Sequence, residues 1–249
     1  MFSGTNAFHG SFFEGGNASY EAGTPTLESI FCRQPAEKLE AGEALFWEGD
    51  QARHLFEITE GVLRIFKIIA DGRRVITGFM YPGDLVGVSL KDRFLYSAEA
   101  VTAVKFRRFT RKSFQDEMNR CPHLRPLLFA RLCDEMAAAQ DQMVLLSRKS
   151  AEERLCSFFL LLMRRRSEHD RAAGIVQLPM TRLDIADYLG LTIETVSRTM
   201  TKLMGRGVVS ASGRHAIKIA RPAQLALLAG DSDEYDSSLP ACADRSARH

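Results

Sequence analysis

The spacing of apolar residues changes along the chain near residue 120. Before that point, glycines recur every 7–12 residues and separate short β-prone runs at residues 44–47, 55–59, 62–69, 75–80 and 104–109. Short strands at this spacing, with glycine in the turns, predict an antiparallel sandwich or barrel of the jelly-roll kind. Asp71-Gly72 between two apolar runs is typical of a tight hairpin, and Pro82-Gly83-Asp84 marks a further turn.

A long helix with a narrow apolar stripe follows the β-prone half. Its apolar residues alternate spacings of three and four: Phe129, Leu132, Met136, Ala139, Met143 and Leu146. This pattern is an a/d seam of nearly three heptads, and Pro122 precedes it as a helix-entry signal. So narrow a stripe favours a coiled coil with a second copy of the chain; the alternative is a helix packed on its own β-domain. A second helix is predicted at residues 151–166.

Two short helices joined by a tight turn are predicted after residue 180. Thr181 and Asp184 form a capping box that opens a helix at 182–189, Gly190 ends this helix, and Thr192 caps the next one at 193–204. We expect the inward-facing residues to be Leu183, Ile185, Ala186 and Leu189 in the first helix and Val196, Met200 and Leu203 in the second. The arrangement indicates a helix-turn-helix.

Short β-prone segments flank the two helices. A strand at 175–178 precedes them, and strands at 208–211 and 216–219, joined through Ser212-Gly213-Arg214, follow as a two-stranded wing before a short final helix from Arg221. The sequence therefore predicts five parts: a poorly ordered extension (1–26), a β-roll (27–120), a dimerisation helix (121–147), a winged helix-turn-helix (148–230) and a disordered acidic tail (231–249).

The composition excludes several classes of protein. The chain has 249 residues, of which 45% are apolar and 26% charged, and five scattered cysteines. These values exclude a disordered chain, a collagen-like chain and a disulfide scaffold. The longest apolar run, 158–163, is far shorter than the roughly 20 residues of a membrane span, and residues 1–16 show no signal peptide. We expect a soluble, cytoplasmic protein with no membrane partner.

Charge is distributed unevenly along the chain. The net charge is only +2. However, residues 180–221 hold seven basic and three acidic residues, whereas residues 1–40 and 231–249 each hold two basic and five acidic ones. The small net charge is thus the sum of a basic segment and two acidic ends. It does not exclude a nucleic-acid partner.

The second helix of the predicted pair carries the candidate chemistry. In a helix-turn-helix, the N-terminal residues of this helix meet base edges in the major groove. The spacing of Glu194, Ser197 and Arg198 places all three on one face. Arginine can donate two hydrogen bonds to guanine, and glutamate accepts one from cytosine N4. The alternative is a solvated Glu–Arg pair. Candidates for the DNA backbone are Thr181, Arg182, Thr192, Thr195, Lys202 and Arg214.

Five segments together resemble the family of the cyclic-AMP receptor protein and FNR. They are residues 42–50, 56–61, 71–72, 82–87 and 191–198, and the resemblance covers about residues 39–228. It implies an α+β fold: an N-terminal jelly-roll of the cyclic-nucleotide-binding type, a long dimerisation helix and a C-terminal winged helix-turn-helix. Glu194-x-x-Ser197-Arg198 is similar to the reading motif of the FNR and FixK branch, and Ile193 stands where the cyclic-AMP branch has Arg.

The branch resemblance implies a specific function. It implies a homodimeric activator that binds a TTGAT-N4-ATCAA-like palindrome, recruits RNA polymerase and serves microaerobic or nitrogen-fixation control.

The β-roll departs from the better-known members of this family. Gly87 is followed by Val88 rather than Glu, and Ser97 is preceded by Tyr96 rather than Arg, so we expect no tight nucleotide binding. A four-thiolate iron–sulfur cluster of the FNR type is not available, because only Cys32 precedes Cys121. The remaining candidate ligands show no metal-site spacing: Cys133, Cys156, Cys242, His9 and His54. We predict no cofactor and no metal.

Three other functions remain to be weighed against a ligand-independent regulator. The same regulator could be gated by haem, nitric oxide or a small molecule in the β-roll. The chain could instead be a cyclic-nucleotide-binding module of an enzyme or channel, which the winged helix argues against. An enzyme is not expected, because the sequence has no Gly-x-Ser-x-Gly and no P-loop, and Glu168-His169-Asp170 reads as a polar loop.

Overall fold

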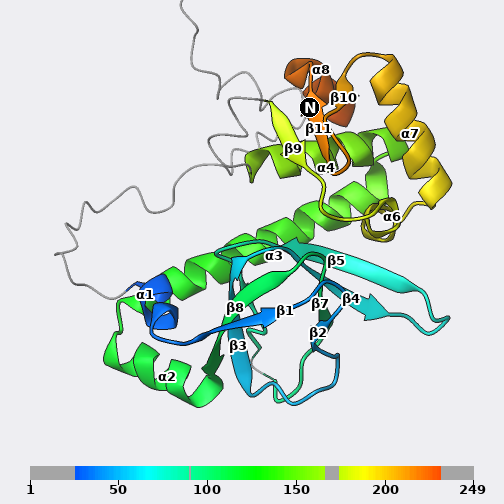
Figure 1. The fold of residues 1–249 in the computed structure, drawn as a ribbon. Coiled ribbons are helices and arrows are strands. Elements are labelled where there is room, and N and C mark those ends of the chain that lie inside the picture. Colours follow the sequence, from blue (N-terminus) through cyan, green and yellow to red (C-terminus); the bar gives the residue numbers. More distant parts are fainter. Residues whose placement is uncertain (1–25, 90, 166–173, 231–249) are drawn as a thin grey trace, which may run out of the picture.

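The computed structural model describes residues 26–89, 91–165 and 174–230 (Figure 1). The predicted acidic tail, nearly all of the predicted N-terminal extension and the Glu168-His169-Asp170 segment lie outside these ranges.

Two antiparallel four-stranded sheets form the predicted β-roll. The first has the order β1 (Ala36–Leu39), β8 (Val104–Thr110), β3 (His54–Glu60) and β6 (Leu85–Val86). The second has the order β2 (Ala44–Phe46), β7 (Ser97–Ala100), β4 (Leu63–Ile68) and β5 (Arg74–Met80). All five expected strands are present within one or two residues, and the short strands β1, β6 and β7 are additional.

Aromatic side chains fill the space between the two sheets. The rings of Phe46 and Phe94 stack with centroids 3.7 Å apart, and Phe56 packs beside them at 5.7 Å from Phe46. Phe106 closes the cluster, with its ring 5.8 Å from that of Phe56. All four side chains are buried. The period-two pattern of the strands therefore produces a buried apolar interior, beside which these four rings help to line a hollow of about 260 Å³.

Two short helices that the apolar pattern did not predict close one end of the roll. These are α1 (Leu27–Cys32) and α2 (Arg111–Arg120), which share a cluster with the end of β8 and the start of the long helix. Phe31 is fully buried in this cluster, 5.4 Å from the ring of Phe109. Helix α2 is mostly polar, and only Phe114 and Met118 are buried. Two apolar positions are too few to show a helical period in the sequence.

The long helix α3 (Leu124–Arg148) connects the roll to the C-terminal module. Figure 1 shows it running above the roll, from α1 and α2 at one end towards the module at the other. Of the α3 residues only Leu124 is buried. The apolar stripe faces solvent, with exposed fractions of 66% for Phe129, 60% for Met136 and 63% for Met143. None of the helices in the described ranges has the length and apolarity of a membrane span.

The C-terminal module has the predicted helix-turn-helix and wing. Its elements are α4 (Ala151–Arg164), β9 (Ile175–Gln177), α6 (Arg182–Leu189), α7 (Ile193–Gly205), β10 (Val209–Ala211), β11 (Ala216–Ile219) and α8 (Pro222–Ala229). Strand β9 pairs with β11, so the wing belongs to a three-stranded sheet rather than a two-stranded one.

One inward-facing residue was predicted wrongly. Leu183 is 49% exposed, whereas Ile185, Ala186 and Leu189 are buried as expected. Tyr188 takes the missing place in the core. The reason is that α6 buries the face that meets both the module and the roll, and Leu183 lies on the remaining side.

Gly61 provides a test of the roll's turn geometry. Its φ is +82°, and a Cβ there would overlap the carbonyl oxygen of Ala103; Gly72 has φ +83° but open space around it. Gly72→Ala should lower the free energy of unfolding by about 1–2 kcal/mol through backbone strain alone. Gly61→Ala should cost roughly 1–3 kcal/mol more, because the overlap adds to the strain. Urea unfolding of both variants measures the difference, and equal losses would contradict it.

Candidate nucleic-acid interface

The start of α6 is held by the predicted capping box. The Thr181 hydroxyl oxygen accepts from the Asp184 backbone N–H at 3.1 Å, and Asp184 Oδ2 accepts from the Thr181 N–H at 3.0 Å. The Thr181 hydroxyl also donates to the same Oδ2 at 2.7 Å. These bonds satisfy backbone groups that the first helical turn leaves unpaired.

The end of α6 is held from outside the helix. Gly190 adopts the left-handed conformation, with φ +61°, and ends the helix as predicted. Arg154 of α4 donates to the Leu189 carbonyl at 2.9 Å, and Gln142 of α3 donates to the Tyr188 carbonyl at 2.9 Å. Carbonyls that α6 leaves free at its C-terminus thus anchor it to both neighbouring helices.

Helix α7 presents the three predicted reading residues on its outer side. Thr192 caps the helix, as expected, by accepting from the Thr195 N–H at 3.2 Å. Glu194 and Arg198 are exposed and Ser197 is partly exposed. The inner side is buried and consists of Val196, Thr199, Met200 and Leu203. The outer side of the first two turns of α7 is therefore free to meet a partner, while the buried inner side holds the helix on the module.

Glu194 carries a negative charge at neutral pH. A hydrogen bond from its own backbone N–H lowers the pKa of the Glu194 carboxyl, and the Thr192 hydroxyl and the nearby Arg198 guanidinium lower it further. Within the described residues Arg198 makes no ion pair and no hydrogen bond. A charged acceptor and a guanidinium with free donors are thus side by side.

The predicted backbone-contact residues fall into three groups. Arg182 and Arg214 are exposed, although Arg182 donates a 3.2 Å hydrogen bond to Ser197 Oγ. Thr181, Thr192 and Thr195 surround the two helix starts and are engaged in the caps. Lys202 instead forms an ion pair with Glu152 of α4, which also binds Arg206 at 2.6 Å. The contact of Glu152 with Lys202 and Arg206 was not predicted, because it joins α4 to the end of α7.

A buried ion-pair network joins α6 to the β-roll. Asp184 Oδ1 accepts from Arg64 of β4 at 3.0 Å and from Arg74 of β5 at 2.8 Å. Arg64 also pairs with Glu99, and Arg74 Nε donates to Asp187 at 2.9 Å. The side chain of Asp184 is only 2% exposed. No sequence pattern indicated this network beyond two arginines within apolar strands.

Aromatic packing reinforces the same contact. Phe79 of β5 lies 5.4 Å from the ring of Tyr188, which lies 5.4 Å from the ring of Phe158 in α4. At the far side Arg165 forms a 2.8 Å ion pair with Asp84. The β-roll and the helix-turn-helix therefore share one apolar cluster rather than touching only through charges.

The positions that depart from the cyclic-nucleotide members are occupied by internal contacts. The Gly87 N–H donates to the Tyr96 hydroxyl at 3.1 Å. Ser97 is buried, and its hydroxyl accepts from the Glu48 N–H at 2.9 Å. The Gly87 N–H and the Ser97 hydroxyl are therefore both engaged within the protein.

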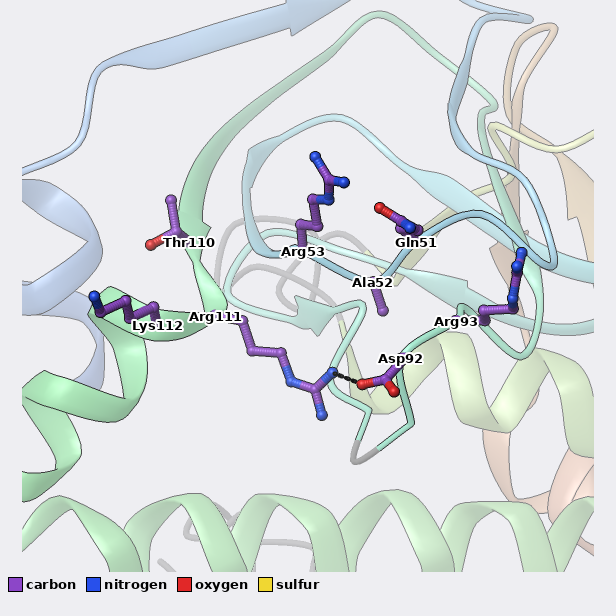
Figure 2. Close-up of a pocket in the computed structure, with 8 residues that line it drawn as sticks. All are labelled: Gln51, Ala52, Arg53, Asp92, Arg93, Thr110, Arg111 and Lys112. Carbon is purple, nitrogen blue, oxygen red and sulfur yellow. Dashed lines mark ion pairs between the residues drawn. The ribbon is translucent and has the colours of Figure 1, made fainter.

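A hollow of about 640 Å³ lies at the end of the roll near α2 (Figure 2). Arg111 points across it to Asp92, at 3.8 Å. The other cationic side chains, those of Arg53, Arg93 and Lys112, point away from this pair in Figure 2. Because they do not converge, the hollow lacks the geometry of an anion site.

The cysteines do not form a ligand set in the described part of the chain. No group of three or more His, Cys, Asp or Glu there could hold a metal ion. Burial raises the pKa of the Cys156 thiol to about 12, which keeps it protonated. Cys32 is exposed and accepts a 3.3 Å hydrogen bond from Arg107. His9 and Cys242 lie outside the described residues.

Two protein families match the chain. Residues 153–228 match the Crp-like helix-turn-helix domain, and residues 36–121 match the cyclic nucleotide-binding domain. The first range contains α6 and α7, and the second contains all eight strands of the roll.

The chain is also similar to characterised proteins. It is 41% identical over 189 residues to the nitrogen fixation regulation protein FixK of Bradyrhizobium diazoefficiens, covering 76% of this chain and 79% of that protein. It is 43% identical over 165 residues to the transcriptional activatory protein AadR of Rhodopseudomonas palustris, covering 65% and 67%. The solved structure of FixK2 from Bradyrhizobium japonicum matches with a TM-score of 0.74 at 33% identity, covering 78% of this chain and 96% of that one.

Removing the Asp184 carboxylate should destabilise the protein strongly. Asp184→Ala leaves two largely buried guanidiniums without their shared acceptor, so we expect a loss of about 3–5 kcal/mol in the free energy of unfolding. Thr181→Ala removes the cap but leaves the ion pairs, and should cost about 1 kcal/mol. Denaturant unfolding of the two variants separates the network from the cap. Losses of the same size would show that the ion pairs contribute nothing.

Proposed function

This chain belongs to the family of the cyclic-AMP receptor protein and FNR, on its FixK-like branch of transcription regulators, and we propose that it acts as a homodimer that activates transcription from a TTGAT-N4-ATCAA-like palindrome. The family consists of DNA-binding regulators and not of enzymes. The dimer, the DNA site and the residues that read it are the proposal. We retain the five-part division of the chain given by the sequence as part of it.

The observation that carries the proposal is the exposed face of the first two turns of α7. Arg198 supplies two donors for guanine O6 and N7, and the ionised Glu194 accepts from cytosine N4. Ser197 lies between them on the same face. Ile193, 41% exposed at the start of the helix, adds an apolar surface beside them. These groups suit base edges better than phosphates, because a carboxylate facing phosphates would be repelled.

Residues around this face supply the phosphate contacts in our proposal. Arg182 and Arg214 are exposed and lie at the start of α6 and in the turn of the wing. Thr181, Thr192 and Thr195 place hydroxyls and helix N-termini beside them. Lys202 contributes only when DNA displaces Glu152. These contacts set affinity and salt dependence rather than sequence choice.

The exposed stripe of α3 supports the homodimer. Its members follow an a/d heptad pattern, and they leave a row of apolar side chains uncovered along one helix: Phe129, Leu132, Met136, Ala139, Met143 and Leu146. A stripe of this length facing water is unfavourable in a monomer. A second α3 in a parallel coiled coil covers it and places two α7 helices to read two half-sites.

The physiological role follows from the relatives. FixK is named a nitrogen fixation regulation protein and AadR a transcriptional activatory protein. We propose that this chain activates genes of microaerobic or nitrogen-fixing growth and recruits RNA polymerase as its protein partner. The hollow beside the aromatic interior of the roll measures about 260 Å³, below the roughly 300–1,000 Å³ of typical ligand pockets, which favours activity that requires no bound ligand over gating by haem, nitric oxide or a small molecule.

Arg198→Ala tests the reading face. We expect a loss of about 1–3 kcal/mol for each half-site and a relaxed preference at the guanine that Arg198 contacts. Arg214→Ala is the matched control, because loss of a phosphate contact should weaken binding to all sequences alike. Competition gel shifts against guanine-substituted palindromes measure both. An Arg198→Ala protein with the wild-type preference at every base would refute this orientation of α7.

Met136→Asp tests the dimer. It places a charge in the apolar seam and should produce monomers that no longer bind the palindrome. Ala138→Asp adds the same charge on an exposed position outside the seam and should leave the dimer intact. Analytical ultracentrifugation reports the mass of each. A Met136→Asp protein that remains dimeric would exclude α3 as the interface.

A further inference from the structure

Helix α6 is held from outside the helix-turn-helix at both of its ends. At its N-terminus, Asp184 binds Arg64 and Arg74 of the β4–β5 hairpin. At its C-terminus, the Tyr188 and Leu189 carbonyls accept from α3 and α4. Of these contacts, only the arginine pair comes from the β-roll, and it is the only one formed by charged groups on both sides.

The arginine pair forms a rigid and well-shielded contact. The side chains are 14% exposed for Arg64, 22% for Arg74 and 2% for Asp184. Each guanidinium also forms a second ion pair, Arg64 with Glu99 and Arg74 with Asp187. Arg74 also lies over the ring of Phe66, with its Cζ 5.9 Å from the centroid. Each arginine is thus oriented by more than its bond to Asp184, and the low exposure limits screening by salt.

The orientation of the reading face depends on this contact. The buried side of α7 packs against α6 in the core of the module, so the two helices move together. The proposed dimer contact lies on α3, which lies along the β-roll. Two paths therefore join α7 to α3: one runs directly through α4, where Glu152 binds Lys202 and Arg206, and the other runs through α6 and its anchors on the β-roll.

We propose that Arg64 and Arg74 are positioning residues for DNA reading, which set the separation of the two α7 helices and therefore the half-site spacing that the dimer accepts. The proposal rests on the proposed function, since spacing has meaning only for a dimer on a palindrome. Neither arginine contacts DNA in it. Each acts through Asp184 and the first turn of α6.

The proposal is tested by measuring how strongly the Arg74→Met variant prefers one spacer length between the two half-sites. The substitution keeps an apolar stem over Phe66 and removes the bonds to Asp184 and Asp187. Binding is measured to palindromes with spacers of three, four, five and six base pairs. Because half-sites must lie one helical turn apart, we expect wild type to prefer one spacer by about tenfold or more, and Arg74→Met to retain about threefold or less. Its preference for guanine within a half-site should not change.

Arg73→Met is the matched control. Arg73 is the neighbouring residue of the same hairpin, its side chain is 76% exposed, and among the described residues that side chain pairs only with Asp71. It should keep the wild-type spacer preference. Asp187→Asn is a milder change, because it weakens the ion pair with Arg74 and leaves Asp184 paired. Its spacer selectivity should lie between those of wild type and Arg74→Met. Unfolding followed by the fluorescence of Trp47, the single tryptophan, shows which variants are folded.

The outcomes separate this inference from the function on which it rests. Reduced spacer selectivity in folded Arg74→Met or Asp187→Asn, with base preference retained, supports it. A uniform loss of affinity at every spacer would mean that the network only stabilises the fold, and would overturn it. Wild-type protein that binds none of the palindromes would overturn the proposed function and the inference together.

Discussion

The buried carboxylate of Asp184 connects the folding of α6 to its place in the molecule. One oxygen closes the capping box with Thr181, and the other accepts from Arg64 and Arg74. A carboxylate that is 2% exposed is stable only when its oxygens are fully hydrogen-bonded. The same group that starts the helix therefore requires the β4–β5 hairpin beside it, and the position of the whole helix-turn-helix follows from that requirement.

Some of the basic side chains of the C-terminal module bind other groups of the protein. Glu152 binds Lys202 and Arg206, and Arg182 donates to Ser197. Arg198 and Arg214 have no such partners in the described residues. In the proposed function, a phosphate that binds Lys202 must displace Glu152, whereas the donors of Arg214 are free to bind a phosphate directly. Affinity for a polyanion depends on this balance as well as on the net charge of the segment.

Local signals predicted the helix-turn-helix closely and the rest of the fold less evenly. Helix α6 has the predicted bounds, because a capping box and a left-handed glycine define both of its ends. Strands β1, β6 and β7 are two to four residues long, too short to show a period. Leu183 was misplaced, since periodicity identifies an apolar face but not which neighbours cover it. The reading, phosphate-contact and dimer residues stay predictions, although their exposure is compatible with those roles.

The sequence by itself determined the longer strands, most of the helices, the main turns and the face on which Glu194, Ser197 and Arg198 lie. Capping bonds join residues three apart, and helical and strand periods repeat within a few positions, so both can be read along the chain. Only the tertiary structure decided which charges meet. Arg64 and Arg74 lie 120 and 110 residues from Asp184, and no local pattern relates such positions. Their pairing depends on the path of the chain through the roll and α3, which packing of the whole protein sets.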